Sequence, residues 1–512
     1  MNFADYFESA ADRFPDKTAI IFRDEEITYA QLRRRVDLLA GAFDDLGIRQ
    51  GDVVGLLARN SARYLEMLLA CAKRGVALEQ YNWRMAPGLT AELLGESRSS
   101  VLFADRACWE ALQIDGLDVG RELAKVVVEG SADGVSGIAL DDVLAQAAPF
   151  EGDAPRSDDE ALMHLFTSGT TGKPKTVRLS NKGVVSVALV CIAETGWTSD
   201  DVFLQVLPLF HISAQAAYNV LMLGGTLIIH EAFSPEAYFD ALRRYRVTRL
   251  GLVPNMLGAL LDCEEFDSRH FPDVNTIIYA GSSMPRSVLE KTLDRLHCGL
   301  YAFYGMTEMS SVVGILKPRD HDAIRAKSES APVPIGRPSM GSRLRICAED
   351  GTVLPEGREG ELVVRSDGMM LGYSRDDLTE RAVRDGWYWT GDMCYRDEEG
   401  YCYLVGRKGD MIVSGGENIY PSEVEECIRR MGDAVSDVAV VGIPDERWGQ
   451  MVAAAVVVRK GFSLEEADIA AWCSEALASY KKPRRVAFVE DLPRNANGKV
   501  VRKEVARMFI GG

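Results

Sequence analysis

One stretch of nine residues limits what this chain can be: positions 167–175 read Thr-Ser-Gly-Thr-Thr-Gly-Lys-Pro-Lys. They follow a short apolar run, 161–166, which is typical of a strand that leads into a loop. The four hydroxyls, two glycines and two lysines can offer backbone N–H groups, O–H donors and positive charge to a polyphosphate. The stretch therefore predicts a phosphate-binding loop. A plain polar connection between two strands is the alternative.

The stretch does not fit the Walker A pattern of P-loop NTPases. That pattern requires glycine where Thr167 stands, and Ser or Thr where Pro174 follows the lysine. Pro174 also disfavours a helix that begins directly on Lys173, because the residue before a proline prefers extended geometry. These two departures exclude a P-loop NTPase.

The length and charge of the chain narrow its class further. Its 512 residues exceed one hydrophobic core and suggest a large domain, or paired subdomains, with a smaller one. The net charge of −18 argues against a nucleic-acid partner, which would need a basic face. No apolar stretch has the length of a membrane span or a signal-peptide core, and the ten cysteines lack zinc or CxxC spacing. We expect a soluble, cytoplasmic protein with reduced thiols and no integral membrane segment.

Helix and strand patterns alternate from the start of the chain. Apolar residues recur at helical spacing from Phe3 to Phe14. Thr28 and Gln31 have the spacing of a capping box at the start of a second helix, and 53–57 is an apolar strand pattern. This alternation predicts an α/β protein.

The octapeptide at 168–175 resembles the signature of the adenylate-forming superfamily, which contains acyl-CoA synthetases, beetle luciferases and the adenylation domains of peptide synthetases. The resemblance extends along most of the chain. It implies a large N-terminal domain of α/β subdomains at 1–406, a hinge at 407–410 and a small, mobile α+β domain at 411–512. It also implies ATP, Mg²⁺, coenzyme A and a carboxylic acid as ligands, and it is compatible with a homodimer.

The run Tyr-Gly-Met-Thr-Glu at 304–308 combines a carboxylate with a hydroxyl and a glycine, which suits a magnesium ion on ATP phosphates. The resemblance assigns Thr307 to the α-phosphate and Glu308 to the metal, whereas a solvated loop glutamate is the alternative. Asp392, after an aromatic strand, can accept both ribose hydroxyls, and the resemblance makes Arg407 the second ribose contact. The complete set of ATP-binding residues that the resemblance implies is Thr167, Ser168, Gly169, Thr170, Thr171, Gly172, Lys173, Ala280, Gly281, Ser282, Tyr304, Gly305, Met306, Thr307, Asp392, Arg407 and Lys499.

The resemblance also locates the acid. His211 follows a strand-like run and matches a residue that borders the acyl pocket, although a histidine beside apolar residues is more often packed in a core. Residues 212–220 contain no acid to hold a substrate ammonium, and Phe303 stands where malonate-activating relatives carry arginine. A monocarboxylate that is not an amino acid is therefore favoured. The expected pocket residues are His211, Ala217, Tyr218, Gly281, Gly305, Val312 and Val313.

The last hundred residues carry the remaining expected functions. The glycine-rich run at 415–425 resembles that of chlorobenzoate–CoA ligase, in which the glycine pair lines the pantetheine tunnel. Lys499 matches the catalytic lysine of the family, beside the alternative of an exposed polar turn, and Gly409 takes the place of the usual Asp or Lys at the hinge. The expected CoA residues are Arg84, Gly415, Gly416, Trp448, Tyr480, Lys482 and Arg484, although 480–484 also fits a solvated basic surface. The expected catalytic residues are Lys499, Thr307, Glu308 and His211.

These expectations describe an AMP-forming acyl-CoA synthetase that acts on a fatty or an aromatic monocarboxylate. The acid attacks the α-phosphorus of ATP, and the CoA thiol then attacks the acyl-adenylate after the small domain has turned about Gly409. A luciferase-like oxygenase, a domain that loads a carrier protein and a non-catalytic nucleotide sensor are the alternatives.

Overall fold

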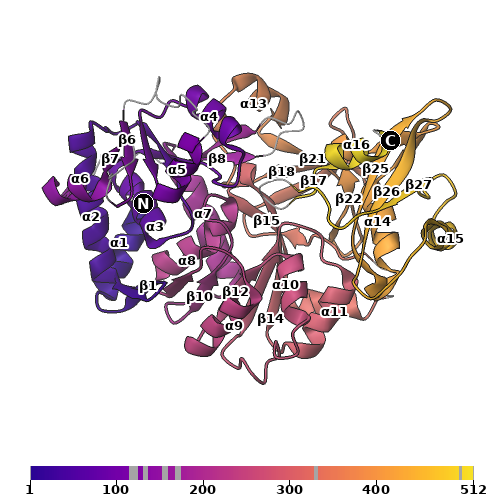
Figure 1. The fold of residues 1–512 in the computed structure, drawn as a ribbon, viewed down its shortest axis with the longest axis horizontal. Coiled ribbons are helices and arrows are strands. Elements are labelled where there is room, and N and C mark those ends of the chain that lie inside the picture. Colours follow the sequence, from indigo (N-terminus) through magenta and orange to yellow (C-terminus); the bar gives the residue numbers. More distant parts are fainter. Residues whose placement is uncertain are drawn as a thin grey trace.

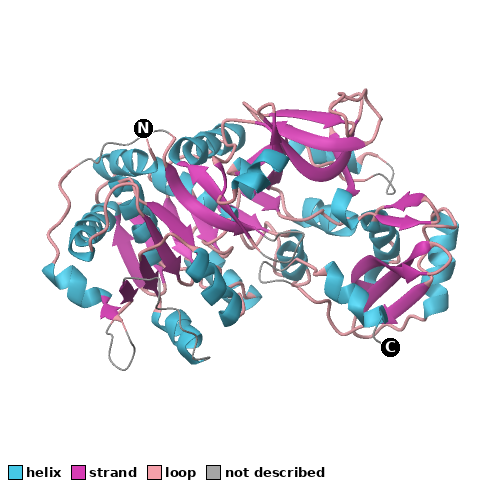
Figure 2. Cartoon of the chain, turned by 90° about the horizontal axis from the view of Figure 1, so that it is seen from above, coloured by secondary structure: helices cyan, strands magenta, loops and turns pink. Residues whose placement is uncertain are grey.

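The computed structural model describes residues 2–114, 125–130, 137–152, 159–167, 174–327, 332–494 and 499–510. Within these ranges the chain forms three sheets up to Arg407 and a fourth sheet after it (Figure 1). The predicted class is confirmed: a large α/β N-terminal domain carries a smaller C-terminal domain beside it (Figure 2). Over the same ranges, no helix combines the length and the apolar character that a membrane crossing requires.

The first sheet has its strands in the order β16-β15-β14-β13-β12-β10-β11-β1-β2 over the described residues. Its six central strands run parallel, and antiparallel strands close both edges. The carboxyl ends of parallel strands share one edge, which brings the segments after β13 and β14 together. The bounds are β1 Thr18–Phe22, β2 Glu25–Thr28, β10 Val202–Gln205, β11 Thr226–Ile229, β12 Arg249–Leu252, β13 Thr276–Ala280, β14 Gly299–Met306, β15 Ser311–Leu316 and β16 Arg337–Pro338.

The second sheet has the order β19-β9-β8-β4-β3-β5-β6-β7 in the described part of the chain. Its strands β8 and β9 form an antiparallel hairpin whose last pair is Thr167 with Lys175, so the predicted phosphate loop connects the two. Residues 168–173 themselves lie outside the described residues. The bounds are β3 Val53–Leu57, β4 Ala77–Gln80, β5 Val101–Ala104, β6 Lys125–Val128, β7 Ile138–Ala139, β8 Ala161–Thr167, β9 Lys175–Ser180 and β19 Gly372–Tyr373.

The third and fourth sheets are built mostly from antiparallel pairs. The third contains β17 Arg343–Cys347, β18 Gly360–Arg365, β20 Val383–Arg384, β21 Trp387–Arg396 and β22 Cys402–Arg407. The fourth belongs to the small domain and contains β23 Ile412–Ser414, β24 Glu417–Ile419, β25 Val435–Asp445, β26 Gly449–Val458 and β27 Arg485–Phe488. The apolar runs at 438–441, 452–458 and 486–488 form much of β25, β26 and β27.

Local sequence signals explain where the main helices begin. Thr28 and Gln31 form the predicted capping box of α2, with the Thr28 N–H donating to Gln31 Oε1 over 2.8 Å. Pro421 opens α14, which suits a residue without an N–H, whereas Pro285 is the N-cap of α11 instead of its first residue. The helices are α1 Phe3–Arg13, α2 Tyr29–Leu46, α3 Ala62–Arg74, α4 Pro87–Glu96, α5 Arg106–Ile114, α6 Leu140–Gln146, α7 Asn181–Thr195, α8 Gln215–Leu223, α9 Pro235–Arg244, α10 Pro254–Leu261, α11 Arg286–Arg295, α12 Pro318–Arg325, α13 Asp376–Ala382, α14 Pro421–Arg429, α15 Glu466–Ala476 and α16 Arg502–Ile510, with short 3-10 turns η1 Ile212–Ala214, η2 Thr307–Met309, η3 Lys408–Asp410 and η4 Gly432–Ala434.

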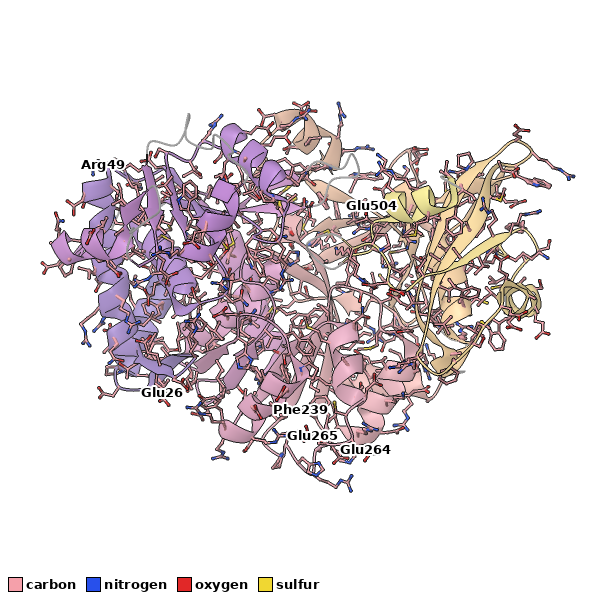
Figure 3. All side chains as sticks on the ribbon, viewed as in Figure 1. Glu26, Arg49, Phe239, Glu264, Glu265 and Glu504 are labelled. Carbon is pink, nitrogen blue, oxygen red and sulfur yellow. The ribbon has the colours of Figure 1, made fainter. Side chains whose placement is uncertain are left out.

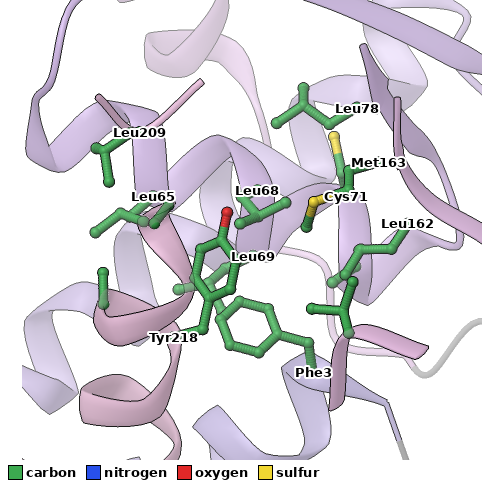
Figure 4. Close-up of a cluster of buried hydrophobic side chains, with 14 of the residues drawn as sticks. Phe3, Leu65, Leu68, Leu69, Cys71, Leu78, Leu162, Met163, Leu209 and Tyr218 are labelled. Atoms are coloured by element: carbon green, nitrogen blue, oxygen red, sulfur yellow. The ribbon is translucent and has the colours of Figure 1, made fainter. Parts of the chain in front are cut away.

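The largest core joins α1, α3 and α8 to the second sheet. Figure 4 shows Tyr218 of α8 directed at Phe3 and at the leucines of α3, and its ring centroid lies 5.2 Å from that of Phe3. Burial of one such aromatic side chain contributes roughly 1.5–3 kcal/mol. The Tyr218 ring thus packs in this core, and its role at the acyl pocket stays a prediction. Charged residues such as Glu26 and Arg49 instead lie exposed at the edge of the molecule (Figure 3).

Candidate active site

Three strands bring the predicted ribose residues together. Asp392 lies within β21, whereas the sequence analysis placed it after the aromatic strand, and it is the register partner of Arg407 on β22. Arg407 Nε donates to Asp392 Oδ1 over 3.0 Å, and the hydroxyl of Tyr304 on β14 donates to Oδ2 over 2.6 Å. Asp392 is buried, so two fixed donors balance the cost of burying its charge.

Glu308 is held by residues that the motifs did not predict. It lies buried in η2, directly after β14, and the hydroxyl of Tyr373 donates to its Oε1 over 2.9 Å. The hydroxyls of Tyr373 and Tyr388 are 3.2 Å apart. A buried carboxylate held by a neutral hydroxyl keeps its negative charge available, and carboxylate oxygen is the ligand that Mg²⁺ prefers. The site therefore fits a magnesium ion on Glu308.

The backbone around Glu308 explains why position 305 is glycine. A Cβ on Gly305 would lie 1.8 Å from the Ser311 carbonyl oxygen of the neighbouring strand. The chain between them turns sharply, with positive φ at Ser310 and Ser311. Gly305 thus serves a close approach of two strands, and any side chain there would first displace the β14–β15 hairpin.

Gly281, which follows β13, is explained by its backbone conformation. Gly281 has a φ of +91°, which favours glycine, and its missing Cβ would meet only Val253, at 3.5 Å. Gly281 and Ser282 are exposed, and Ala280 is partly exposed. Backbone at the carboxyl edge of the sheet is therefore open to a ligand at the residues that the resemblance assigns to ATP.

Lys499 reaches this site from the small domain. The Lys499 residue is exposed to solvent, but the protein atoms around it and the charge of Arg407 lower its pKa, while the carboxylates of Asp392 and Glu308 act in the opposite direction. Burial and the charge of Lys499 lower the pKa of His211 to about 4. Four predicted residues that are far apart in sequence therefore interact with the charge of Lys499: Arg407, Asp392, Glu308 and His211.

The ends of the phosphate loop point to the same region. Thr167 Oγ1 lies 3.5 Å from the Lys175 carbonyl oxygen, across the hairpin. The ammonium group of Lys175 lies 5.1 Å from the centroid of the Tyr373 ring, which holds Glu308. The described ends of the loop therefore stand beside the magnesium candidate.

The predicted acyl-pocket residues divide between two faces of β15. Val312 packs with Val187 and Cys191 of α7, and Phe303 packs against the same small cluster. Successive residues of a strand point to opposite faces, and Val313 belongs to the main core instead. Val312 and Val313 therefore face different clusters, and which of them borders the acid stays a prediction. Ala217 is fully buried on α8, and His211 caps η1 at the start of that segment.

The CoA residues lie on both domains. In the small domain the Gly415 N–H donates to the Trp448 carbonyl oxygen over 2.8 Å, and a Cβ on Gly415 would lie 2.6 Å from the Trp448 ring. Arg484 stands over that ring, 5.4 Å from its centroid. Gly416 and Tyr480 are exposed and Lys482 is partly exposed, while Arg84 stands on the large domain over Trp83. An apolar platform with positive charge is thus present on the small domain.

Comparison with known proteins agrees with this geometry. The model of the AMP-binding enzyme family matches residues 7–374, and that of the AMP-binding enzyme C-terminal domain matches 423–499. The chain belongs to the AMP-binding enzyme family. The indoleacetate–CoA ligase of Aromatoleum aromaticum is 34% identical over all of this chain and 98% of its own length, and the feruloyl-CoA synthase of an Amycolatopsis species is 35% identical over 97% and 96%.

Solved structures extend the comparison to bound ligands. The o-succinylbenzoate–CoA synthetase of Bacillus subtilis superposes with a TM-score of 0.85 in its complex with ATP and magnesium, at 29% identity and 98% coverage of both chains. Its complex with the acyl-adenylate intermediate gives a TM-score of 0.84 at 28% identity, over 98% of this chain and 97% of that one.

Proposed function

We propose that this protein is an AMP-forming acyl-CoA synthetase, which converts a carboxylic acid, ATP and CoA to an acyl-CoA, AMP and diphosphate. One observation carries the proposal. A lysine of the small domain interacts electrostatically with Glu308, Asp392 and His211 of the large domain. An adenylating enzyme needs this combination of a cation, a metal-binding carboxylate and a ribose acceptor around one phosphorus atom.

The side chains divide the work of the first half-reaction. Asp392, fixed by Tyr304 and Arg407, would bind the ribose and set the position of the α-phosphate. Lys499 would neutralise the charge shared by the attacking carboxylate and that phosphate, and Thr307 would contact the same phosphate. Glu308 would hold the magnesium ion, which supplies positive charge to the diphosphate leaving group. Catalysis in this arrangement comes from positioning and charge, without a protein nucleophile.

We propose an aromatic monocarboxylate as the acid. The buried apolar cluster of Val187, Cys191 and Val312, with Phe303 against it, lies next to Gly305 and would form one wall of the acid pocket. The sequence similarity to relatives that are named for indoleacetate and ferulate also supports an aromatic acid. A fatty acid remains the competing acid within the same enzyme class.

The second half-reaction would use the small domain in another orientation. We propose the division 1–406, hinge 407–410 and 411–512, with Gly409 as the pivot. Rotation would withdraw Lys499 and bring Gly416 and the Trp448 platform to the acyl-adenylate. We also propose a cytoplasmic location, which the ten free cysteines support. The resemblance supports a homodimer.

A screen of acids tests the function and the acid together. Acid-dependent diphosphate release is measured with ATP and Mg²⁺ over matched aromatic and fatty acids, and thioester formation is then measured with CoA and with a holo-carrier protein as alternative acceptors. We expect release with aromatic acids and product with CoA. Release without transfer to CoA would contradict the synthetase, and product with the carrier protein alone would indicate a loading domain.

A further inference from the structure

The link between the two domains is fixed on both sides of one residue. Lys408, Gly409 and Asp410 form the single 3-10 turn η3. The side chains on either side of the glycine form ion pairs with different domains. Lys408 pairs with the large domain, and Asp410 pairs with the small domain. Gly409 is thus left between two attached residues.

The attachment to the large domain uses strands of the third sheet. Lys408 Nζ lies 3.6 Å from Glu361 Oε2 and 3.2 Å from Glu349 Oε1. The Glu349 side chain is 88% exposed, so this contact adds little, whereas the Glu361 side chain is 12% exposed. The Gly391 N–H donates to the other oxygen of Glu361 over 3.0 Å, so the carboxylate that meets Lys408 is itself held in place.

The attachment to the small domain runs through Arg502. Its Nε lies 3.3 Å from Asp410 Oδ2. Its guanidinium also forms a two-pronged contact with Glu425 of α14, whose side chain is 7% exposed, and donates to the Val440 carbonyl oxygen over 2.6 Å. Asp410 therefore meets a cation that the small domain holds rigidly.

Arg502 also stands close to the catalytic lysine. It is the first residue of α16 and follows Lys499 by three positions. The Val501 N–H donates to the Pro493 carbonyl oxygen over 2.8 Å, which closes the loop that carries Lys499. A contact to Arg502 thus links residue 410 to the segment that delivers the lysine.

From this arrangement we propose that Lys408 and Asp410 are positioning residues, which attach the two ends of η3 to different domains and confine the rotation of the small domain to Gly409. The inference rests on the proposed two-step function. Lys408 stays with the large domain and Asp410 with the small domain, so the backbone dihedrals change only at Gly409. The small domain therefore returns Lys499 to the same position after each rotation. Asp410 thereby replaces the acid that the family usually carries one residue earlier.

Hydrogen exchange of the free enzyme tests the attachments without any substrate. Asp410→Asn leaves the Arg502 contact with Glu425 in place, and Lys408→Met keeps the length of the side chain while removing its charge. Glu426→Gln is the matched control, because Glu426 of α14 forms a partly exposed ion pair with Arg430, which involves neither Lys408 nor Asp410. We expect exchange at 407–412 to quicken about fivefold in both variants, equivalent to about 1 kcal/mol, with no change in the control.

Separate assays of the two half-reactions provide the second readout. In Asp410→Asn we expect adenylation to slow about fivefold and thioester formation from supplied acyl-adenylate to change less than twofold, and Asp410→Glu to restore the wild-type ratio. Unchanged exchange at 407–412 in both variants, or an equal change in Glu426→Gln, would overturn the inference. If the wild type forms no thioester from any acid, the proposed function fails, while the exchange result still decides the attachments.

Discussion

Replacement of Lys499 by alanine should separate the two half-reactions. The variant loses a positive charge that stands among Glu308, Asp392 and His211 in the observed orientation. Arg407 cannot replace it, since its guanidinium is bound to Asp392 at 3.0 Å and the second oxygen of that carboxylate is held by Tyr304. The vacated position would therefore stay without a cation.

The size of the loss follows from the charge. Two unit charges about 4 Å apart interact by about 4 kcal/mol at an effective dielectric constant of about 20. Removal of one preorganised donor from an active site costs about 3–4 kcal/mol, which corresponds to a loss of about 10²–10³-fold in rate. We expect that loss in adenylation, whereas thioester formation from supplied acyl-adenylate should persist, since Lys499 would be withdrawn in that step.

Single-turnover diphosphate release without CoA measures the first step, and thioester formation from acyl-adenylate measures the second. Lys503→Ala, at an exposed lysine of α16 four residues further along the chain, is the matched control and should leave both rates unchanged. The wild-type adenylation rate should also fall as the pH rises through the lowered pKa of Lys499, because only the protonated amine carries the charge. Equal losses in both steps would show that Lys499 is structural and would refute this reasoning.

Four further outcomes are expected. Gly409→Pro should trap one orientation, so that about one turnover of diphosphate release continues while acyl-CoA production falls sharply, whereas Gly409→Asp should leave both steps nearly intact; wild-type turnover by the proline variant would place the pivot elsewhere. Gly305→Leu should lower the free energy of unfolding by roughly 1–3 kcal/mol in chemical denaturation, because its Cβ meets the Ser311 backbone, and an unaltered stability with a shifted acid profile would restore the simple pocket view. Tyr373→Phe should raise the Mg²⁺ concentration for half-maximal adenylation about tenfold through loss of a hydrogen bond to a carboxylate, and an unchanged magnesium dependence would separate Glu308 from the metal. Because the pKa of His211 is lowered from 6.5 to about 4, the unfolded chain binds the extra proton first, so stability should fall as the pH drops from about 6.5 to about 4, and His211→Asn should lose less over that range in thermal unfolding.

Local signals in the sequence predicted much of the fold. The capping box at Thr28 and the apolar strand at 53–57 depend on neighbours within a few residues, and each is found where it was expected. The contacts of the site residues are more difficult to predict, because a motif gives the type of a residue but not the residues that it contacts. Asp392 was predicted from its motif, but its contact with Tyr304 joins positions 88 residues apart.

Other contacts could not be predicted from the sequence, because they depend on the direction in which the folded chain points each side chain. Tyr373 donates to Glu308 from 65 positions further along the chain, and the Tyr388 hydroxyl lies 3.2 Å from that of Tyr373, so only the folded chain shows that the three residues meet. Tyr218 stands close to His211 in sequence, but the helical turn directs its ring at Phe3. Val313 is separated from Val312 by one step of a strand, which reverses the face that it occupies.

The Tyr304–Asp392 contact has a consequence for protein engineering. Tyr304 belongs to the first sheet and Asp392 to the third, so one hydrogen bond ties the nucleotide site to both. A chimera that takes its acid specificity from one homologue and its nucleotide site from another must therefore inherit 299–407 as one block. The small domain contributes Lys499 from a separate sheet, and it is the segment that such a recombination could exchange as a cassette.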